Sequence, residues 1–223
     1  MSQVRIGILG ATGPAGRGLA ARLASVGFEV VVGSRSVERA GEIRDALITR
    51  WEGLDLPIEA ADNAGAAAAD VVVVATPWDA AASTAAAVAA QLEGKVVVSM
   101  ANALARVGHE FQPLVPPRGS VAASVQAALP RSRVAAAFHH VPARELGDLG
   151  APVVSDVLVC SDHPSATETC LGIIGRVPDL RPLDAGELSN AAPIEAFAAV
   201  LLQLNARYRT RAAVKFTGID LDL

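Results

Sequence analysis

A glycine-rich segment near the amino end is the first feature that could do chemistry. Residues 10–16 read GATGPAG; they follow a short apolar run and precede a segment with helical periodicity. In that context a glycine turn presents backbone N–H groups and a helix N-terminus to a pyrophosphate. Because Pro14 has no N–H, the phosphate contacts would come from the other amides of the turn. These are the amides of Thr12, Gly13, Ala15 and Gly16. The segment predicts a dinucleotide site, with a purely structural turn as the alternative.

The end of the second predicted strand indicates which dinucleotide. An NAD-binding unit places Asp or Glu about 20 residues after the turn, where it binds ribose hydroxyls. Here that position reads Gly33-Ser34-Arg35. A hydroxyl and a guanidinium suit the dianionic 2′-phosphate of NADP, which a carboxylate would repel. Arg39, one helical turn later, can add a second positive charge. The charges therefore favour NADP, and a solvated basic helix start is the alternative.

Two later strand ends carry further candidate residues. Thr76, Pro77 and Trp78 follow the fourth predicted strand, and His139 and His140 follow a later one. Ligands of an open parallel sheet lie outside the carboxyl ends of its strands, so Thr76 and Trp78 should lie beside the nicotinamide. His139 could donate a hydrogen bond to a substrate carbonyl. Trp78 could equally fill the core, and either histidine could be structural.

The groups that usually perform covalent, metal or acid–base catalysis are missing from the sequence. The single tyrosine, Tyr208, lacks the Tyr-x-x-x-Lys spacing of short-chain dehydrogenases, whose glycine loop residues 10–16 imitate. There is no GxSxG, HExxH or CxxC motif, and the four histidines are not spaced as metal ligands. We therefore expect no metal and no certain catalytic residue, with His139 as a weak candidate. This inventory fits hydride transfer to an acceptor that needs little proton management.

The elements that must position these residues alternate between strands and helices. Apolar runs predict strands at 4–9, 28–32, 56–60, 71–75, 95–99, 134–138, 157–160 and 179–183, with helices between most of them. Ser36 should N-cap the second helix, and a capping box at 165–168 should begin a later one. Residues 101–130 are expected to form a loop and a short helix. In the last helix one face should carry Ile194, Phe197, Leu201, Leu204 and Tyr208.

These elements predict an α/β fold with a Rossmann-type, doubly wound, mostly parallel sheet. We expect an NADP-binding domain at residues 1–141 and a small C-terminal α/β lobe at 142–223 that closes a substrate cleft.

Composition excludes several other classes of protein. The chain has 223 residues, 52% of them hydrophobic, and a net charge of −4 with scattered basic residues, which argues against nucleic acid as a partner. Its apolar runs are shorter than the roughly 18 residues of a membrane span. The start does not read as a secretory leader. Cys160 and Cys170 cannot build a disulfide framework, so we expect a cytoplasmic protein with two buried thiols.

Several of these motifs, taken in order, resemble a known family. They are the glycine turn, Ser34-Arg35, Pro77-Trp78, residues 138–143 (FHHVPA) and residues 180–190 (LRPLDAGELSN). With them the chain resembles the NADPH-dependent reductases of coenzyme F420, a 5-deazaflavin, over nearly its whole length. Residues 180–190 are the most diagnostic, because glycine turns alone are common.

The resemblance implies a homodimer that transfers a hydride directly between NADP(H) and coenzyme F420. It places the cofactor contacts at Thr12, Gly13, Pro14, Ala15, Ser34, Arg35, Arg39, Trp78, Ala82, Val141 and Ala212, and His139 on the deazaflavin side. The chain departs from the family's turn at Ala11, where glycine is frequent, and at Pro14, where a hydrogen-bond donor is frequent. Two alternatives remain: a non-catalytic NADP-sensing module, and a reductase of an imine or a small carbonyl compound. The sensor does not predict residues 180–190.

Overall fold

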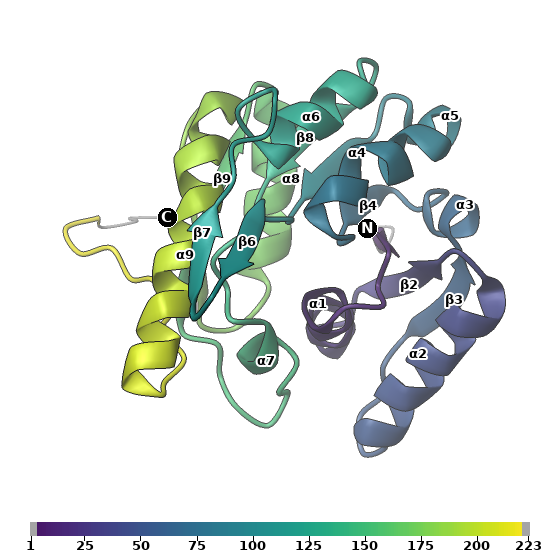
Figure 1. Ribbon diagram of the computed structural model, residues 1–223. Helices are drawn as coiled ribbons and strands as arrows, with labels where there is room; N and C mark the ends of the chain where they lie inside the picture. The colour runs from purple at the N-terminus through teal and green to yellow at the C-terminus, as the bar shows by residue number, and fades with distance from the viewer. Residues whose placement is uncertain (1–3, 220–223) are drawn as a thin grey trace.

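One eight-stranded sheet organises the part of the chain that the computed structural model describes, residues 4–219 (Figure 1). Its strands are β1 (Arg5–Leu9), β2 (Glu29–Ser34), β3 (Ile58–Asp62), β4 (Val71–Val74), β5 (Val96–Ser99), β8 (Arg133–Ala136), β9 (Ser155–Ser161) and β10 (Leu180–Asp184). They lie in the order β10-β9-β8-β5-β4-β1-β2-β3, and every neighbouring pair is parallel except β8 and β9. The predicted doubly wound, mostly parallel sheet is confirmed.

Helices cover both faces of this sheet, which is why its central strands are runs of buried valine. The helices are α1 (Pro14–Ser25), α2 (Val37–Arg50), α3 (Asn63–Ala66), α4 (Trp78–Ala87), α5 (Ala89–Leu92), α6 (Val121–Ala128), α7 (Ala143–Leu146), α8 (Pro164–Gly175) and α9 (Ala191–Tyr208). One hydrophobic core packs α1, α2, α7 and α8 against one face of the sheet. A second core packs α3, α4, α5 and α6 against the other face. Strand order reverses at β1 and β4, the switch point where ligands of this fold bind.

The local signals for the first two helices are confirmed, with one exception. Gly27, at φ +85°, follows the end of α1 as expected of a glycine after a helix. The Ser36 hydroxyl caps α2 by accepting a hydrogen bond from the Arg39 N–H, at 3.3 Å. Val37, whose helical spacing from the buried Ala40 and Ile43 would place it on the same face of α2, is exposed in the first turn.

The predicted capping box at residues 165–168 is wrong. Helix α8 begins one residue earlier, at Pro164, and its N-cap His163 makes no side-chain cap bond. Proline suits the first helical position because its missing N–H has no intrahelical acceptor there. The Ser165 hydroxyl instead accepts a hydrogen bond from Arg133 Nη1, at 3.1 Å.

The expectation of a loop and a short helix at residues 101–130 is only half right. The short helix is α6, but a hairpin of β6 (Leu104–Val107) and β7 (Glu110–Pro113) precedes it. Gly108, at φ +61°, makes the tight turn between the two strands. The hairpin lies beside α9, as Figure 1 shows.

The carboxyl half continues the same sheet. The predicted domain boundary after residue 141 falls between β8 and β9, where the sheet changes from parallel to antiparallel. Helix α9 includes Pro193 in its first turn. Of the five residues expected on one face, Ile194 and Leu201 are buried, whereas Phe197, Leu204 and Tyr208 are 42%, 36% and 74% exposed. Alanines on the adjacent stripe let α9 pack closely and leave the larger side chains outside.

Two further expectations concern the described residues as a whole. Cys160 and Cys170 are free and buried, as predicted. No helix within residues 4–219 has the length and apolarity needed to cross a membrane.

Candidate functional site

Three pockets lie around the glycine turn and the carboxyl ends of the central strands. We call them the strand-end pocket (about 680 Å³), the cleft (about 350 Å³) and the arginine pocket (about 620 Å³). The strand-end and arginine pockets share Thr12, and the cleft and the arginine pocket share Ala143 and Arg144. All three volumes fall in the range of small-molecule sites.

The strand-end pocket brings together five of the predicted residues. They are Thr12, Ser34, Arg35, Arg39 and Thr76. Ser34 is buried at the end of β2, whereas Arg35 is exposed and forms no ion pair within residues 4–219. Arg39 pairs with the exposed Glu42. None of the described lining residues is acidic, so the pocket suits a phosphate dianion.

The backbone of the turn explains its glycines. Gly10 has φ +68°, and a Cβ there would lie 2.3 Å from Thr76 Cγ2. At Gly16 a Cβ would lie 3.1 Å from Ala75 Cβ, a tight contact, so glycine lets α1 start close to the end of β4. Asn63 Oδ1 accepts a hydrogen bond from the Gly10 N–H, at 3.3 Å.

One of the amides that we expected to bind phosphate is not available. The Thr12 N–H donates to the Gly10 carbonyl, at 2.7 Å, so it is already used within the turn. The N–H groups of Gly13, Ala15 and Gly16 belong to the N-cap and first turn of α1, where helix geometry provides no acceptor. These three amides and the positive end of the helix dipole form an anion site.

The cleft lies between the ends of β5 and β8, α7, α9 and the segment after α9. Ala15, His139, Val141 and Ala212 line it, as the resemblance implies. Three of the other predicted residues, Gly13, Trp78 and Ala82, line none of the three pockets; Trp78 packs against the core on the α4 side of the sheet. Nowhere in the described chain do three His, Cys, Asp or Glu side chains gather as a metal site would require.

His139 is held at the edge of the cleft by Asn102. Asn102 Nδ2 donates to the His139 carbonyl at 2.8 Å, which turns its Oδ1 toward His139 Nδ1, 3.1 Å away. Since Oδ1 can only accept, Nδ1 carries the proton and Nε2 is a bare acceptor. The preceding residue, Phe138, has φ +65°, a left-handed conformation that is rare outside glycine.

The environment of His139 keeps its ring neutral. Burial, followed by the proximity of His140, lowers the pKa of His139 to about 3. A neutral ring with a bare Nε2 accepts hydrogen bonds from N–H or O–H groups. The expected donation from His139 to a substrate carbonyl therefore requires a proton that this tautomer does not carry at Nε2.

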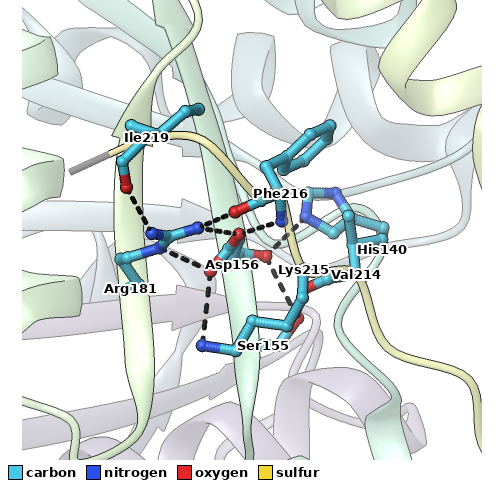
Figure 2. A network of polar contacts seen from close by, with 8 residues as sticks. All are labelled: His140, Ser155, Asp156, Arg181, Val214, Lys215, Phe216 and Ile219. Carbon is cyan, nitrogen blue, oxygen red and sulfur yellow. Dashed lines mark hydrogen bonds and ion pairs between the residues drawn. The ribbon is translucent and has the colours of Figure 1, made fainter.

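A buried ion pair anchors the chain segment that follows α9, part of which lines the cleft; Figure 2 shows the polar contacts of this ion pair. Asp156 on β9 is fully buried and accepts hydrogen bonds from Arg181 Nε and Nη2, at 2.8 and 2.6 Å, and from the Phe216 N–H, at 2.6 Å. Arg181 is its register partner on β10, and Lys215 Nζ lies 3.5 Å from the carboxylate. The Arg181 hydrogen bonds are the main cause of the lowered pKa of Asp156.

Asp156 also connects its ion pair with Arg181 to His140, the neighbour of His139. The backbone carbonyl of Asp156 accepts a hydrogen bond from His140 Nε2, at 2.8 Å. Arg211, in the segment that follows α9, binds Glu145 of α7 at 2.8 Å. Both ends of this segment are therefore tied down, which fixes Ala212 in the wall of the cleft.

Each pocket contains at least one buried polar atom for which the described protein provides no hydrogen-bond partner. These atoms are Thr76 Oγ1 in the strand-end pocket, His139 Nε2 and Glu145 Oε2 in the cleft, and Arg17 Nε in the arginine pocket. A buried polar atom without a partner is costly and calls for an explanation, such as a ligand. All three pockets therefore contain a polar atom that is available to a ligand.

Sequence reasoning missed several of these residues. Asn63 and Asn102 come shortly after β3 and β5, so the strand-end rule that singled out Thr76 could have found them. Arg17, Arg50 and Arg144 carried no such signal, because α1, α2 and α7 bring them together only in the folded chain.

Comparisons with known proteins agree with this geometry. The family model described as "NADP oxidoreductase coenzyme F420-dependent" matches residues 5–103. An F420-dependent NADP reductase of Methanocaldococcus jannaschii is 34% identical over 98% of this chain and 100% of its own length. One of Methanothermobacter thermautotrophicus is 34% identical over 97% of this chain and 96% of its own.

A solved structure extends the likeness to the fold. A candidate F420-dependent NADP reductase from Arthrobacter sp. FB24 superposes with a TM-score of 0.79 at 24% identity, covering 96% of this chain and 100% of that one. At that identity the likeness concerns the fold alone.

Proposed function

The chain belongs to the family of coenzyme F420-dependent NADP oxidoreductases, and from that premise we propose that it transfers a hydride directly between NADP(H) and coenzyme F420. The observation that carries the proposal is the set of unpartnered polar atoms in linked pockets beside a dinucleotide turn. We place both reacting rings, the nicotinamide and the deazaflavin, in the cleft beside His139.

The NADP end of the site is supported by charge. Ser34 and Arg35 offer a hydroxyl and a guanidinium to the 2′-phosphate, and no described acidic side chain lines their pocket. The first-turn amides of α1 bind the pyrophosphate. Thr76 Oγ1, which lacks a partner in the protein, provides a further contact between the two.

At the reacting end of the site, the task of the protein is to orient the nicotinamide and deazaflavin rings. When bound, NADP(H) and the deazaflavin supply the hydride donor and acceptor carbons, C4 of nicotinamide and C5 of F420. Val141 and Ala212 shape the walls of the cleft and exclude water. His139 Nε2 accepts a hydrogen bond from a ring N–H. These residues would hold the two rings about 3–3.5 Å apart, a reactive separation, and no nucleophile is needed.

We also propose that the protein is a homodimer in the cytoplasm. A homodimer is supported by the apolar stripe that α9 leaves exposed, Phe197, Val200, Leu204 and Tyr208. Residues 142–223 act as the lobe that closes the cleft, which the anchored segment around Ala212 supports. The two free, buried thiols fit a reducing cytoplasm.

An absorbance assay tests this function against its rivals. Purified protein with NADPH should bleach the band of oxidised F420. A sensing module would bind NADPH and leave the band unchanged, and an imine or carbonyl reductase would oxidise NADPH only when given that other substrate. Either result would refute the proposal.

A further inference from the structure

The arginine pocket has no assigned ligand. It lies between α1, α2 and α7, and three arginines line it, Arg17, Arg50 and Arg144, with no acidic residue among its described lining. Three guanidinium groups around one hollow repel one another unless a negative charge lies between them. The composition of the pocket therefore points to an anionic ligand.

None of these arginines has a carboxylate partner within residues 4–219. Arg17 Nε is buried without an acceptor, and the Arg50 guanidinium lies over the Trp51 ring, 5.2 Å from its centroid. Arg131, elsewhere on the surface, pairs with Glu93 at 3.0 Å. The arginines of the pocket thus keep their hydrogen-bond donors available for a ligand.

Thr12 and Pro14 of the glycine turn also line this pocket, but the groups assigned to NADP leave its three arginines without a ligand. The 2′-phosphate of NADP is assigned to Ser34 and Arg35, and its pyrophosphate to the first turn of α1. The arginine pocket adjoins the cleft through Ala143 and Arg144, so the second substrate can reach it from there. That substrate, coenzyme F420, carries a side chain with a phosphodiester and carboxylates beyond its ring.

We propose that the arginine pocket binds this anionic side chain while the deazaflavin ring lies in the cleft. The proposal rests on the proposed function. The side chain leaves the ring, crosses α7 at Ala143 and Arg144, and meets Arg50 and Arg17. Bidentate guanidinium contacts suit both phosphodiester and carboxylate groups.

The structure holds α7 rigidly against α1 at this point. The buried Arg22 of α1 donates to the carbonyls of Glu145, Leu146 and Asp148, at 2.9, 3.1 and 2.6 Å. A Cβ on Gly18 would lie 2.9 Å from the Ala143 carbonyl oxygen, so only glycine permits this approach. The backbone of Arg144 is therefore fixed relative to Arg17, as a preformed anion site requires.

The test compares two substrates in charge-removing variants. Arg50→Gln and Arg144→Gln each replace an exposed arginine of the pocket. Arg131→Gln is the control: it makes the same charge change at an exposed arginine near the amino end of β8, whereas the cleft lies at the carboxyl end of that strand. The substrates are F420 and the same deazaflavin without the phosphate and carboxylates. Each pocket variant should raise KM for F420 on the order of tenfold. For Arg50→Gln, which does not line the cleft, KM for NADPH, kcat, and KM for the truncated deazaflavin should stay at wild-type values, as should all constants of Arg131→Gln.

Three outcomes would overturn the proposal: an unchanged KM for F420, an equal rise for the truncated substrate, or a rise in KM for NADPH, which would assign the pocket to the nucleotide. Thermal unfolding of each variant checks that it is folded. If the wild-type enzyme neither reduces nor binds F420, the proposed function itself fails. If it reduces F420 and the pocket variants match it, only the present inference fails.

Discussion

Replacing Asp156 with asparagine should loosen the segment that follows α9, part of which lines the cleft. The substitution keeps the shape of the side chain and removes its charge, leaving Arg181 and the Phe216 N–H with a weaker acceptor. Removing one partner of a buried ion pair costs about 3–5 kcal/mol. Asp156 is 0% exposed but the Arg181 side chain is 27% exposed and can regain water, so we expect about 3 kcal/mol. For a chain of this length that lowers Tm by about 6–12 °C.

The effect should depend on pH in a defined direction. Because Arg181 holds the pKa of Asp156 below its ordinary 3.8, the folded protein binds this proton less readily than the unfolded chain. The stabilisation is therefore fully present above pH 3.8, where unfolded Asp is ionised, and is lost as the pH falls through the folded pKa. The Tm difference between wild type and Asp156→Asn should be constant from pH 8 to about 5 and shrink below about 4.

Differential scanning calorimetry across this pH range measures both quantities. Asp45→Asn is the control, because Asp45 forms an exposed pair with Arg44 and should change stability by less than about 1 kcal/mol. The KM for F420 should also rise, since Ala212 lies in the loosened segment. An Asp156→Asn protein with wild-type Tm at pH 7, or a Tm difference that persists unchanged to pH 3, would refute the reasoning.

Two other substitutions test separate parts of the site, and a third tests a buried carboxylate outside it. Arg35→Ala should raise KM for NADPH at least about tenfold and leave KM for NADH almost unchanged; equal effects in steady-state assays would contradict the 2′-phosphate assignment. His139→Ala should slow turnover only a few-fold, and wild-type kcat should show no titration of this residue between pH 5 and 9, because its pKa is lowered to about 3. Glu195 is buried, with both carboxylate oxygens accepting N–H groups at the start of α6, and burial raises its pKa to about 7. Because its pKa is raised on folding, protonated Glu195 stabilises the fold below pH 4.5, and this contribution is lost as the pH rises through 7. In urea titrations, the free energy of unfolding of the wild type should therefore fall relative to that of Glu195→Gln between pH 5 and 8.

The parts of this protein that local patterns encode were predictable from the sequence. The valine run of β4 is buried on both faces, and such runs read directly as strands of a parallel sheet. The glycines of residues 10–16 and the helix that follows could be read from the sequence in order, although the contacts with Ala75 and Thr76 that these glycines permit could not. The charge of Arg35 at the end of β2 likewise needs no tertiary contact to be interpreted.

Contacts between distant residues were beyond that reasoning. Asp156 and Arg181 meet because β9 and β10 adopt one particular register, and the sequence does not show which of several registers forms. Asn102 fixes the tautomer of His139 from 37 positions away. On α9, helical spacing groups Phe197 with Ile194, but close packing through alanines decides which of them is buried.

A deuterium-transfer experiment tests the central claim most directly. NADPH carrying deuterium at the transferable C4 position is incubated with the protein and oxidised F420 in ordinary water, and the reduced deazaflavin is examined by NMR and mass spectrometry. Direct hydride transfer in the cleft predicts one deuterium at C5 of the deazaflavin for each NADPH consumed. Reduced F420 without deuterium, or consumption of NADPH without reduction of F420, would contradict the account.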